Sequence, residues 1–285
     1  MSSIFAVTGL LSNIVFAETS VWKISKGNNY FYLGGTVHLL SADDHPLPVE
    51  FEEAYLDANI IVFETDLLET QTEQFQSKMM AAMTYSDQRT LAGELSPEVY
   101  QKLKLFMATR KIPISNYAKF QPWAISLVIT MVEYQRLGMK QQYGVDTFFN
   151  NRAIADNKKV VGLETTDEQL SFISSMQRVD ADITIEYTLN DLLELPDFIK
   201  LMKKSWRSGD VNEFEKSEYV VRMKTEFPEV YDTLLVKRNN NWMDKLPAFI
   251  NDSSKEFVLV GAMHLNGKEG LLNQLKEQGF KVNQL

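Results

Sequence analysis

Four short apolar runs are spread along the chain, each rich in Val, Ile, Phe or Tyr and each ending at polar residues. Runs of this kind are typical of strands buried in a sheet. They cover residues 29–38, 59–66, 158–165 and 256–264. Two further segments, 20–27 and 280–285, have the pattern of shorter strands, and the first of these is predicted to form a hairpin with residues 29–38.

Helical patterns separate these runs. Residues 48–58, 144–157 and 268–279 are predicted helices, and Gly279 is typical of a helix C-terminus. The middle of the chain, from about 67 to 251, is mostly helical in pattern apart from the third strand. Residues 123–132 are apolar on all sides but too few to cross a membrane, so they predict a core helix.

This order of elements predicts an α/β fold class. We expect a central, mostly parallel or mixed sheet built from both chain ends, with a large helical insertion between them. The chain has 285 residues, 45% of them hydrophobic, which is enough to bury a substantial core. It contains no internal repeat and no Pro/Gly linker, so residues 22–285 are predicted to form a single domain.

Composition narrows the classes of function. The net charge of −9 and the lack of a Lys/Arg-rich run argue against nucleic-acid binding. The chain has no cysteine, so a metal site would have to use His, Asp or Glu.

The first 17 residues have a different character from the rest. They are apolar with small residues, and "VFA" before Glu18 resembles a signal-peptidase site, although no Lys or Arg precedes it. We therefore predict that residues 1–17 are a signal peptide or an apolar N-terminal segment. The protein is then expected to be exported, to the periplasm or beyond, with membrane-surface association through this segment as the alternative.

The four long runs share one further feature, because each ends in ionisable residues: His38, Glu64, Glu164 and His264. The carboxyl ends of parallel strands meet at one edge of a sheet, so we expect these side chains to converge. Such a cluster suits a metal site or a metal-free acid/base site. The alternatives without function are a structural histidine, a solvated strand terminus at Glu64 and a helix-dipole partner at Glu164.

Local patterns support this placement. Both strand-end histidines follow a Gly-x-x-His step, at Gly35 and Gly261, where glycine would let the backbone turn sharply and a ligand approach closely. Thr166 and Gln169 have the spacing of a capping box. A helix is therefore expected directly after Glu164, and its N-terminus would favour the carboxylate form.

The ordered set of motifs resembles the TraB/GumN family, which includes the TIKI proteins, described as metal-dependent proteases acting on Wnt. The resemblance covers about 22–282 and rests on "GGTVHLL", "IVFETD", "GVDTFF", "VVGLETTDEQ", "KRNNNW" and "VLVGAMHLNGKEG". It implies an erythromycin-esterase-like α/β arrangement. It also implies divalent-metal hydrolysis, with Mn, Co or Zn as the cofactor and a peptide or small ester as the substrate.

The residues matching the family's motifs give a hypothetical mechanism. His38 and His264 would hold the metal, with Glu64 as the third ligand or as the general base on a bound water. Arg238, which precedes Asn239 in the "KRNNNW" motif, would orient a carboxylate or stabilise an oxyanion, and Glu164 would fix a ligand or the arginine. The alternative for Arg238 is a buried ion pair with Glu64 or Glu164.

Three hypotheses follow for the function. The first is a metal-dependent hydrolase of the cell envelope, and the second is a metal-free hydrolase in which a histidine and Glu64 activate water. The third is a non-catalytic envelope module that binds a ligand in the same cleft. The sequence does not predict an oligomeric state.

Overall fold

The computed structural model describes residues 19–251 and 253–285, so the signal peptide predicted for residues 1–17 lies outside the described residues. The strands are β1 (Val21–Lys26), β2 (Asn29–Thr36), β3 (Ile60–Phe63), β4 (Lys159–Gly162), β5 (Glu256–Gly261) and β6 (Lys281–Gln284). The helices are α1 (Val49–Asp57), α2 (Glu73–Met83), α3 (Leu91–Glu94), α4 (Pro97–Thr109), α5 (Pro122–Arg136), α6 (Val145–Ala155), α7 (Thr166–Ser174), α8 (Ala181–Ser208), α9 (Val211–Glu215), α10 (Glu218–Glu226), α11 (Pro228–Tyr231), α12 (Lys237–Met243) and α13 (Leu271–Glu277).

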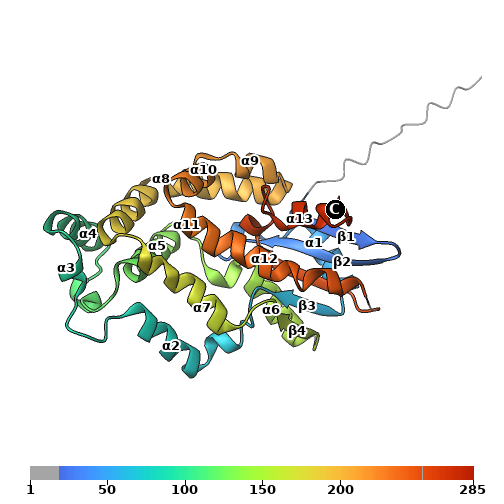
Figure 1. Ribbon diagram of the computed structural model, residues 1–285, viewed down its shortest axis with the longest axis horizontal. Helices are drawn as coiled ribbons and strands as arrows, with labels where there is room; N and C mark the ends of the chain where they lie inside the picture. Colours follow the sequence, from blue (N-terminus) through green and yellow to red (C-terminus); the bar gives the residue numbers. More distant parts are fainter. Residues whose placement is uncertain (1–18, 252) are drawn as a thin grey trace, which may run out of the picture.

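The six strands form one mixed sheet in the order β4-β3-β5-β2-β1-β6. The four strands from β4 to β2 are parallel, whereas β1 runs antiparallel to both β2 and β6. The predicted fold class is confirmed, since strands from both chain ends share this sheet and most of the helices are inserted between β3 and β5 (Figure 1).

Alternate residues of the central strands pack into two hydrophobic cores, one on each face of the sheet. Phe257 of β5 packs in the core that contains Phe51 of α1 and Phe149 of α6. Its neighbour Val258 packs in the second core, which contains Trp242 of α12. This alternation explains why the strands read as continuous apolar runs, because both faces of a parallel sheet are covered by helices.

The predicted strands extend too far at their carboxyl ends. The run 256–264 becomes a strand only to Gly261 and continues as a short 3₁₀ turn, Ala262–His264. The run 29–38 likewise ends as a strand at Thr36. The ionisable residues therefore stand just beyond the sheet, on segments that have left the hydrogen-bonded ladder and are free to turn toward one another.

The sharp backbone turn predicted at the two glycines is wrong. Neither Gly35 nor Gly261 has a positive φ angle, so neither is needed for a left-handed turn. Each is needed for space, because a Cβ on Gly35 would lie 2.9 Å from Leu265 and one on Gly261 would lie 3.1 Å from Glu64 Oε1. The glycines allow close packing around the strand ends.

The helix after β4 starts where it was expected, but its cap is shifted by one residue. Thr165 is the N-cap and forms the capping box with Glu168, so the assignment to Thr166 and Gln169 was wrong. The short apolar run 123–132 lies within α5, whose Trp123 and Ile125 are buried, as predicted. Within residues 19–251 and 253–285, no helix is long and apolar enough to span a membrane.

One helical segment departs from regular geometry close to the strand ends. Between α11 and α12 the chain forms a π-helical turn, Asp232–Val236. Such turns add a residue to the helical repeat and are frequent at functional sites. Trp242 of α12 is fully buried, while Leu234 in the π-helical turn lines a cavity.

Candidate functional site

The strand order brings the four predicted residues together. Because β4, β3, β5 and β2 are successive parallel neighbours, the residues that come after them meet at one edge of the sheet. Glu164 follows β4, Glu64 follows β3, His264 follows β5 and His38 follows β2. Glu64, Glu164 and His264 are buried, whereas His38 is exposed.

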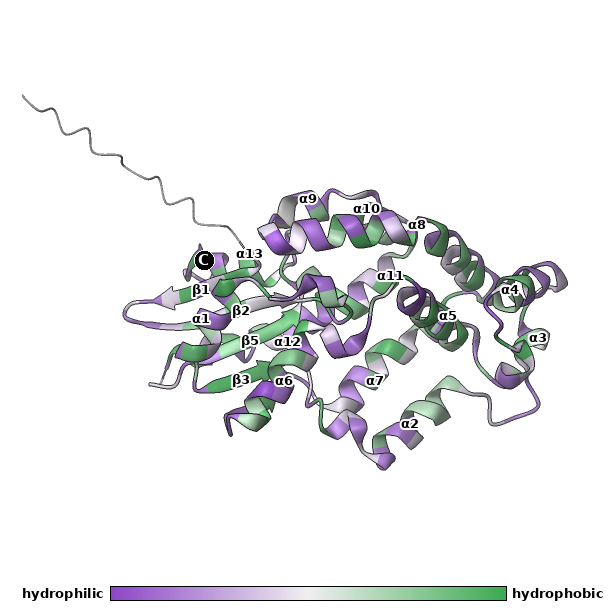
Figure 2. Ribbon diagram, turned by 180° about the vertical axis from the view of Figure 1, so that it is seen from behind, coloured by the Kyte–Doolittle hydropathy of each residue, from purple (hydrophilic) through white to green (hydrophobic). Residues whose placement is uncertain are grey.

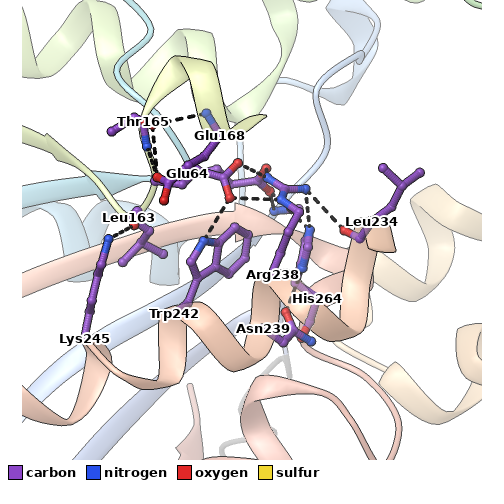
Figure 3. Close-up of polar contacts among 12 residues, drawn as sticks. Glu64, Leu163, Thr165, Glu168, Leu234, Arg238, Asn239, Trp242, Lys245 and His264 are labelled. Atoms are coloured by element: carbon purple, nitrogen blue, oxygen red, sulfur yellow. Dashed lines mark hydrogen bonds and ion pairs between the residues drawn. The ribbon is translucent and has the colours of Figure 1, made fainter. Parts of the chain in front are cut away.

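Arg238 is the hub of this cluster. Its Nε and Nη2 donate to the two oxygens of Glu164 at 3.1 and 2.7 Å, and Nη2 also donates to Glu64 Oε2 at 2.5 Å. Its Nη1 donates to His264 Nε2 at 3.1 Å and to the Leu234 carbonyl at 3.4 Å (Figure 3). These five bonds use all five N–H groups of the guanidinium.

This arrangement decides between the two roles predicted for Arg238. A guanidinium with no free N–H cannot donate to a substrate oxyanion without breaking one of its buried bonds. The buried ion pair is therefore the role that the geometry supports. Trp242 also contacts this ion pair, since its Nε1 donates to Glu164 Oε2 at 3.2 Å and its ring lies 4.8 Å from the Arg238 guanidinium carbon.

His264 is held as a neutral imidazole. Asn239 uses its amide N–H groups on the backbone carbonyls of His264 and Glu269, so its Oδ1 accepts from His264 Nδ1 at 2.7 Å. The proton is thus on Nδ1, and the Nε2 lone pair accepts from Arg238. Burial, assisted by the charge of Arg238, lowers the pKa of His264 to about 3.

His38 has the opposite character. Its side chain is 63% exposed and lines a cavity, and its Nδ1 lies 2.7 Å from Asp146 Oδ2. The Asp146 carboxylate raises the pKa of His38 to about 9. The two histidines were predicted to act as equivalent ligands, but the structure gives them different partners and different protonation states at neutral pH.

The contact between His38 and Asp146 depends on a close approach of two backbones. Asp146 lies in the first turn of α6, whose N-cap is Gly144. A Cβ on Gly144 would lie 2.2 Å from the carbonyl oxygen of His38, so only glycine allows α6 to begin at this position. Sequence reasoning missed Asp146, although it is part of the "GVDTFF" motif.

The pKa values of Glu64 and Glu164 are shifted in opposite directions. Burial opposes ionisation of Glu64, yet Arg238 and the N–H of Gly261, which donates to Oε1 at 2.6 Å, hold the pKa of its carboxyl well below the ordinary value. Burial raises the pKa of Glu164, although hydrogen bonds from Arg238 and Trp242 act in the opposite direction. The helix N-terminus was expected to favour the carboxylate form of Glu164, whereas burial acts in the opposite direction.

The cluster forms the polar end of a cavity of about 450 Å³. Glu64 Oε1 and His38 Nε2 lie 3.1 and 3.7 Å from the position that a Cβ of residue 261 would take, and His264 Cδ2 lies 3.6 Å from it. The missing side chain of Gly261 therefore leaves a small space bordered by a carboxylate and an imidazole. The rest of the wall is mostly apolar and comes from the helical insertion and from the segments that follow β2 and β5.

Two of the three predicted metal ligands already have a partner in this arrangement. His264 Nε2 and Glu64 Oε1 are 3.8 Å apart, a separation that suits two ligands. However, a fixed positive charge already binds both groups, because Arg238 donates to His264 Nε2 and to Glu64 Oε2. Within the described ranges, no group of three His, Asp or Glu side chains is placed to hold a metal ion. The metal therefore stays a prediction from resemblance.

Comparison with known proteins places the chain in a class. The sequence profile of the TraB/PrgY/gumN family matches residues 20–284, so the chain belongs to this family. Two relatives are both described as "Uncharacterized protein YbaP", one from Escherichia coli (strain K12) and one from Shigella flexneri. Each is 26% identical over 251 residues, which cover 88% of this chain and 89% of the relative. No solved structure matches the chain.

Proposed function

We propose that this protein is a hydrolase that activates water with the His38–Asp146 pair and without a metal. One observation carries the proposal: His38 alone in the cluster has a nitrogen facing the cavity with no hydrogen-bond partner among the described residues, while a buried carboxylate orients its other nitrogen. A histidine held in this way is the usual general base of hydrolases.

The chemistry follows from the positions of the groups. The attacking water lies beside Gly261, where it donates a hydrogen bond to Glu64 Oε1 and loses its other proton to His38 Nε2, so that a hydroxide attacks. The resulting imidazolium is stabilised by Asp146. Arg238 acts as a positioning residue, because it holds Glu64 and His264 in place but has no N–H to offer to the substrate.

The pH dependence tests this mechanism. Only neutral His38 can accept a proton, so kcat/KM for a p-nitrophenyl ester is expected to rise with pH and level off above an apparent pKa of about 9. Asp146→Asn removes the charge that raises this pKa. The apparent pKa of the kcat/KM profile should then move toward the ordinary histidine value of about 6.5. The plateau value of kcat/KM should fall at least about tenfold, because the His38 ring is no longer oriented.

A matched control uses a carboxylate away from the cavity. Asp167 is 64% exposed and pairs with Lys78, so Asp167→Asn should leave the pH profile unchanged. A wild-type rate that is flat between pH 6 and 10, or an Asp146→Asn profile with the wild-type midpoint, would contradict the assignment of His38 as the base.

Metal removal separates the two hydrolase hypotheses. Dialysis of the purified protein against a chelator is expected to leave kcat/KM unchanged, because the proposed mechanism uses only side chains. Loss of activity that Mn²⁺, Co²⁺ or Zn²⁺ restores would instead establish the metal-dependent hydrolase, with His38, His264 and Glu64 as ligands after displacement of Arg238. Binding without turnover of any ester or peptide anilide would favour the non-catalytic module.

We also propose, from the sequence alone, that the protein acts in the cell envelope after export. Fractionation of cells that express the full chain is the direct test. Recovery of the whole pool in the cytoplasm with residues 1–17 intact would refute this.

A further inference from the structure

A second cavity lies next to the first one, and the residues of the polar cluster do not line it. It measures about 320 Å³, and its wall comes mainly from α5, α8 and α10. These helices lie to the right of the strands in Figure 2. The two cavities share five lining residues: Tyr134, Phe198, Met223, Leu234 and Met263. Only the first cavity contains His38 and Gly261, so the pair has one reactive end and one apolar end.

The apolar end offers few hydrogen bonds to a ligand. The hydroxyl of Thr184 donates to the Asp180 carbonyl at 2.7 Å, and that of Thr188 donates to the Thr184 carbonyl at 2.7 Å. Asp191 is paired with Arg222 at 2.7 Å. These three polar side chains already have partners, and most of the other lining residues are apolar, so a ligand there meets mainly carbon and sulfur.

The small number of hydrogen-bond partners in the second cavity favours one chemical class of ligand. A peptide carries an N–H and a carbonyl on every residue, and burying them without hydrogen bonds is costly. A hydrocarbon chain has no such groups and gains free energy with every methylene it buries. Methionine side chains at the shared wall, Met223 and Met263, are flexible and adapt to chains of different length and bend.

We propose that the two cavities together bind the acyl chain of a long-chain ester, with the ester carbonyl beside Gly261 and the chain running past the shared wall into the second cavity. This inference rests on the proposed hydrolase and names its substrate class. Water adds to the carbonyl carbon, the bond to the alkoxy oxygen breaks, and the products are a carboxylic acid and an alcohol. His38 takes the proton from water and returns it to the leaving oxygen.

The first experiment measures chain-length dependence with the full chain and p-nitrophenyl esters of acids of 2 to 14 carbons. In the wild type, kcat/KM is expected to increase by up to about fourfold per added methylene until the second cavity is filled. Met223→Trp adds bulk at the shared wall and should reduce the ratio of kcat/KM for 12-carbon and 4-carbon esters at least about tenfold. Met223→Ala should keep a ratio at or above that of the wild type.

The control is Met80→Trp, since Met80 is exposed on α2, outside both cavities. This variant should have the wild-type ratio, and thermal unfolding of each variant shows that it is folded. A chain-length profile that is flat beyond four carbons, or equal ratios in Met223→Trp and the wild type, would overturn the proposal.

A binding experiment distinguishes failure of the inference from failure of the proposed function. The fluorescent fatty acid cis-parinaric acid is titrated into the wild type and His38→Ala, and then displaced by dodecanoate. We expect binding to both proteins and weaker binding to Met223→Trp. Binding without any ester hydrolysis would refute the hydrolase and keep the chain site, whereas hydrolysis of short esters without binding would refute the chain site alone.

Discussion

Replacing Arg238 by methionine is expected to lower the free energy of unfolding at pH 7 by about 3–5 kcal/mol, which is the usual cost of removing one partner from a buried ion pair. Glu64 and Glu164 would lose their shared cation, and His264 would lose the donor to its Nε2. Urea unfolding of the wild type and the variant measures this difference.

The loss of stability in Arg238→Met should depend on pH. The pKa of Glu64 is held low in the folded protein, so its contribution to stability is present above the ordinary carboxyl pKa of about 4.3 and lost as the pH falls below it. In Arg238→Met, burial without a cation raises the pKa values of both glutamates, which then become neutral in mild acid. The difference in the free energy of unfolding between the wild type and Arg238→Met should therefore become smaller as the pH falls from 7 to 4.

Two further variants make this result interpretable. Arg238→Lys keeps a charge but cannot reach both carboxylates and His264 at once, so an intermediate loss is expected. The triple variant with Glu64→Gln and Glu164→Gln removes the uncompensated charges and should recover part of the stability. A change below about 1 kcal/mol in Arg238→Met would show that this pair is as weak as a surface ion pair.

Replacing His38 by alanine should abolish activity without unfolding the protein. Loss of a general base lowers the rate by about 10²–10⁴. Because the side chain is 63% exposed and water screens its pair with Asp146, its removal should lower the free energy of unfolding by much less than the loss of Arg238 does. The measurements are kcat/KM on an ester and urea unfolding on the same preparation.

The other histidines provide controls for this prediction. His45 lies outside the cavity and contacts the Tyr143 carbonyl, so His45→Ala should retain hydrolysis. His264→Ala should lose both activity and stability, because it removes a buried side chain that Asn239 and Arg238 both contact. A fully active His38→Ala would contradict the proposed base, and a strongly unstable one would indicate a structural role.

The sequence predicted the convergence of the strand-end residues because that convergence follows from local patterns. Each apolar run identifies a buried strand, and parallel strands present their carboxyl ends at one edge. His38, Glu64, Glu164 and His264 could therefore be grouped without knowing the strand order. Their protonation states could not be predicted, since these depend on burial and on partners far away in the chain.

Asp146 shows where sequence reasoning stops. It lies in the first turn of α6, and an aspartate in a first helical turn is common for reasons of local stability alone. Its contact with His38 arises from the packing of α6 against the end of β2, which Gly144 permits. The π-helical turn before Arg238 was equally hidden, because the apolar spacing around it is compatible with a continuous α-helix.

The central place of β5 in the sheet also has a consequence for how the protein is made. In the sheet β5 lies between β2 and β3, but along the chain it follows nearly all of the helical insertion. While the ribosome extends the chain, β2 and β3 thus remain without the strand that joins them, and their backbone edges are open to pairing with other chains. Refolding should accordingly be slow, with activity returning only when this long-range pairing is complete.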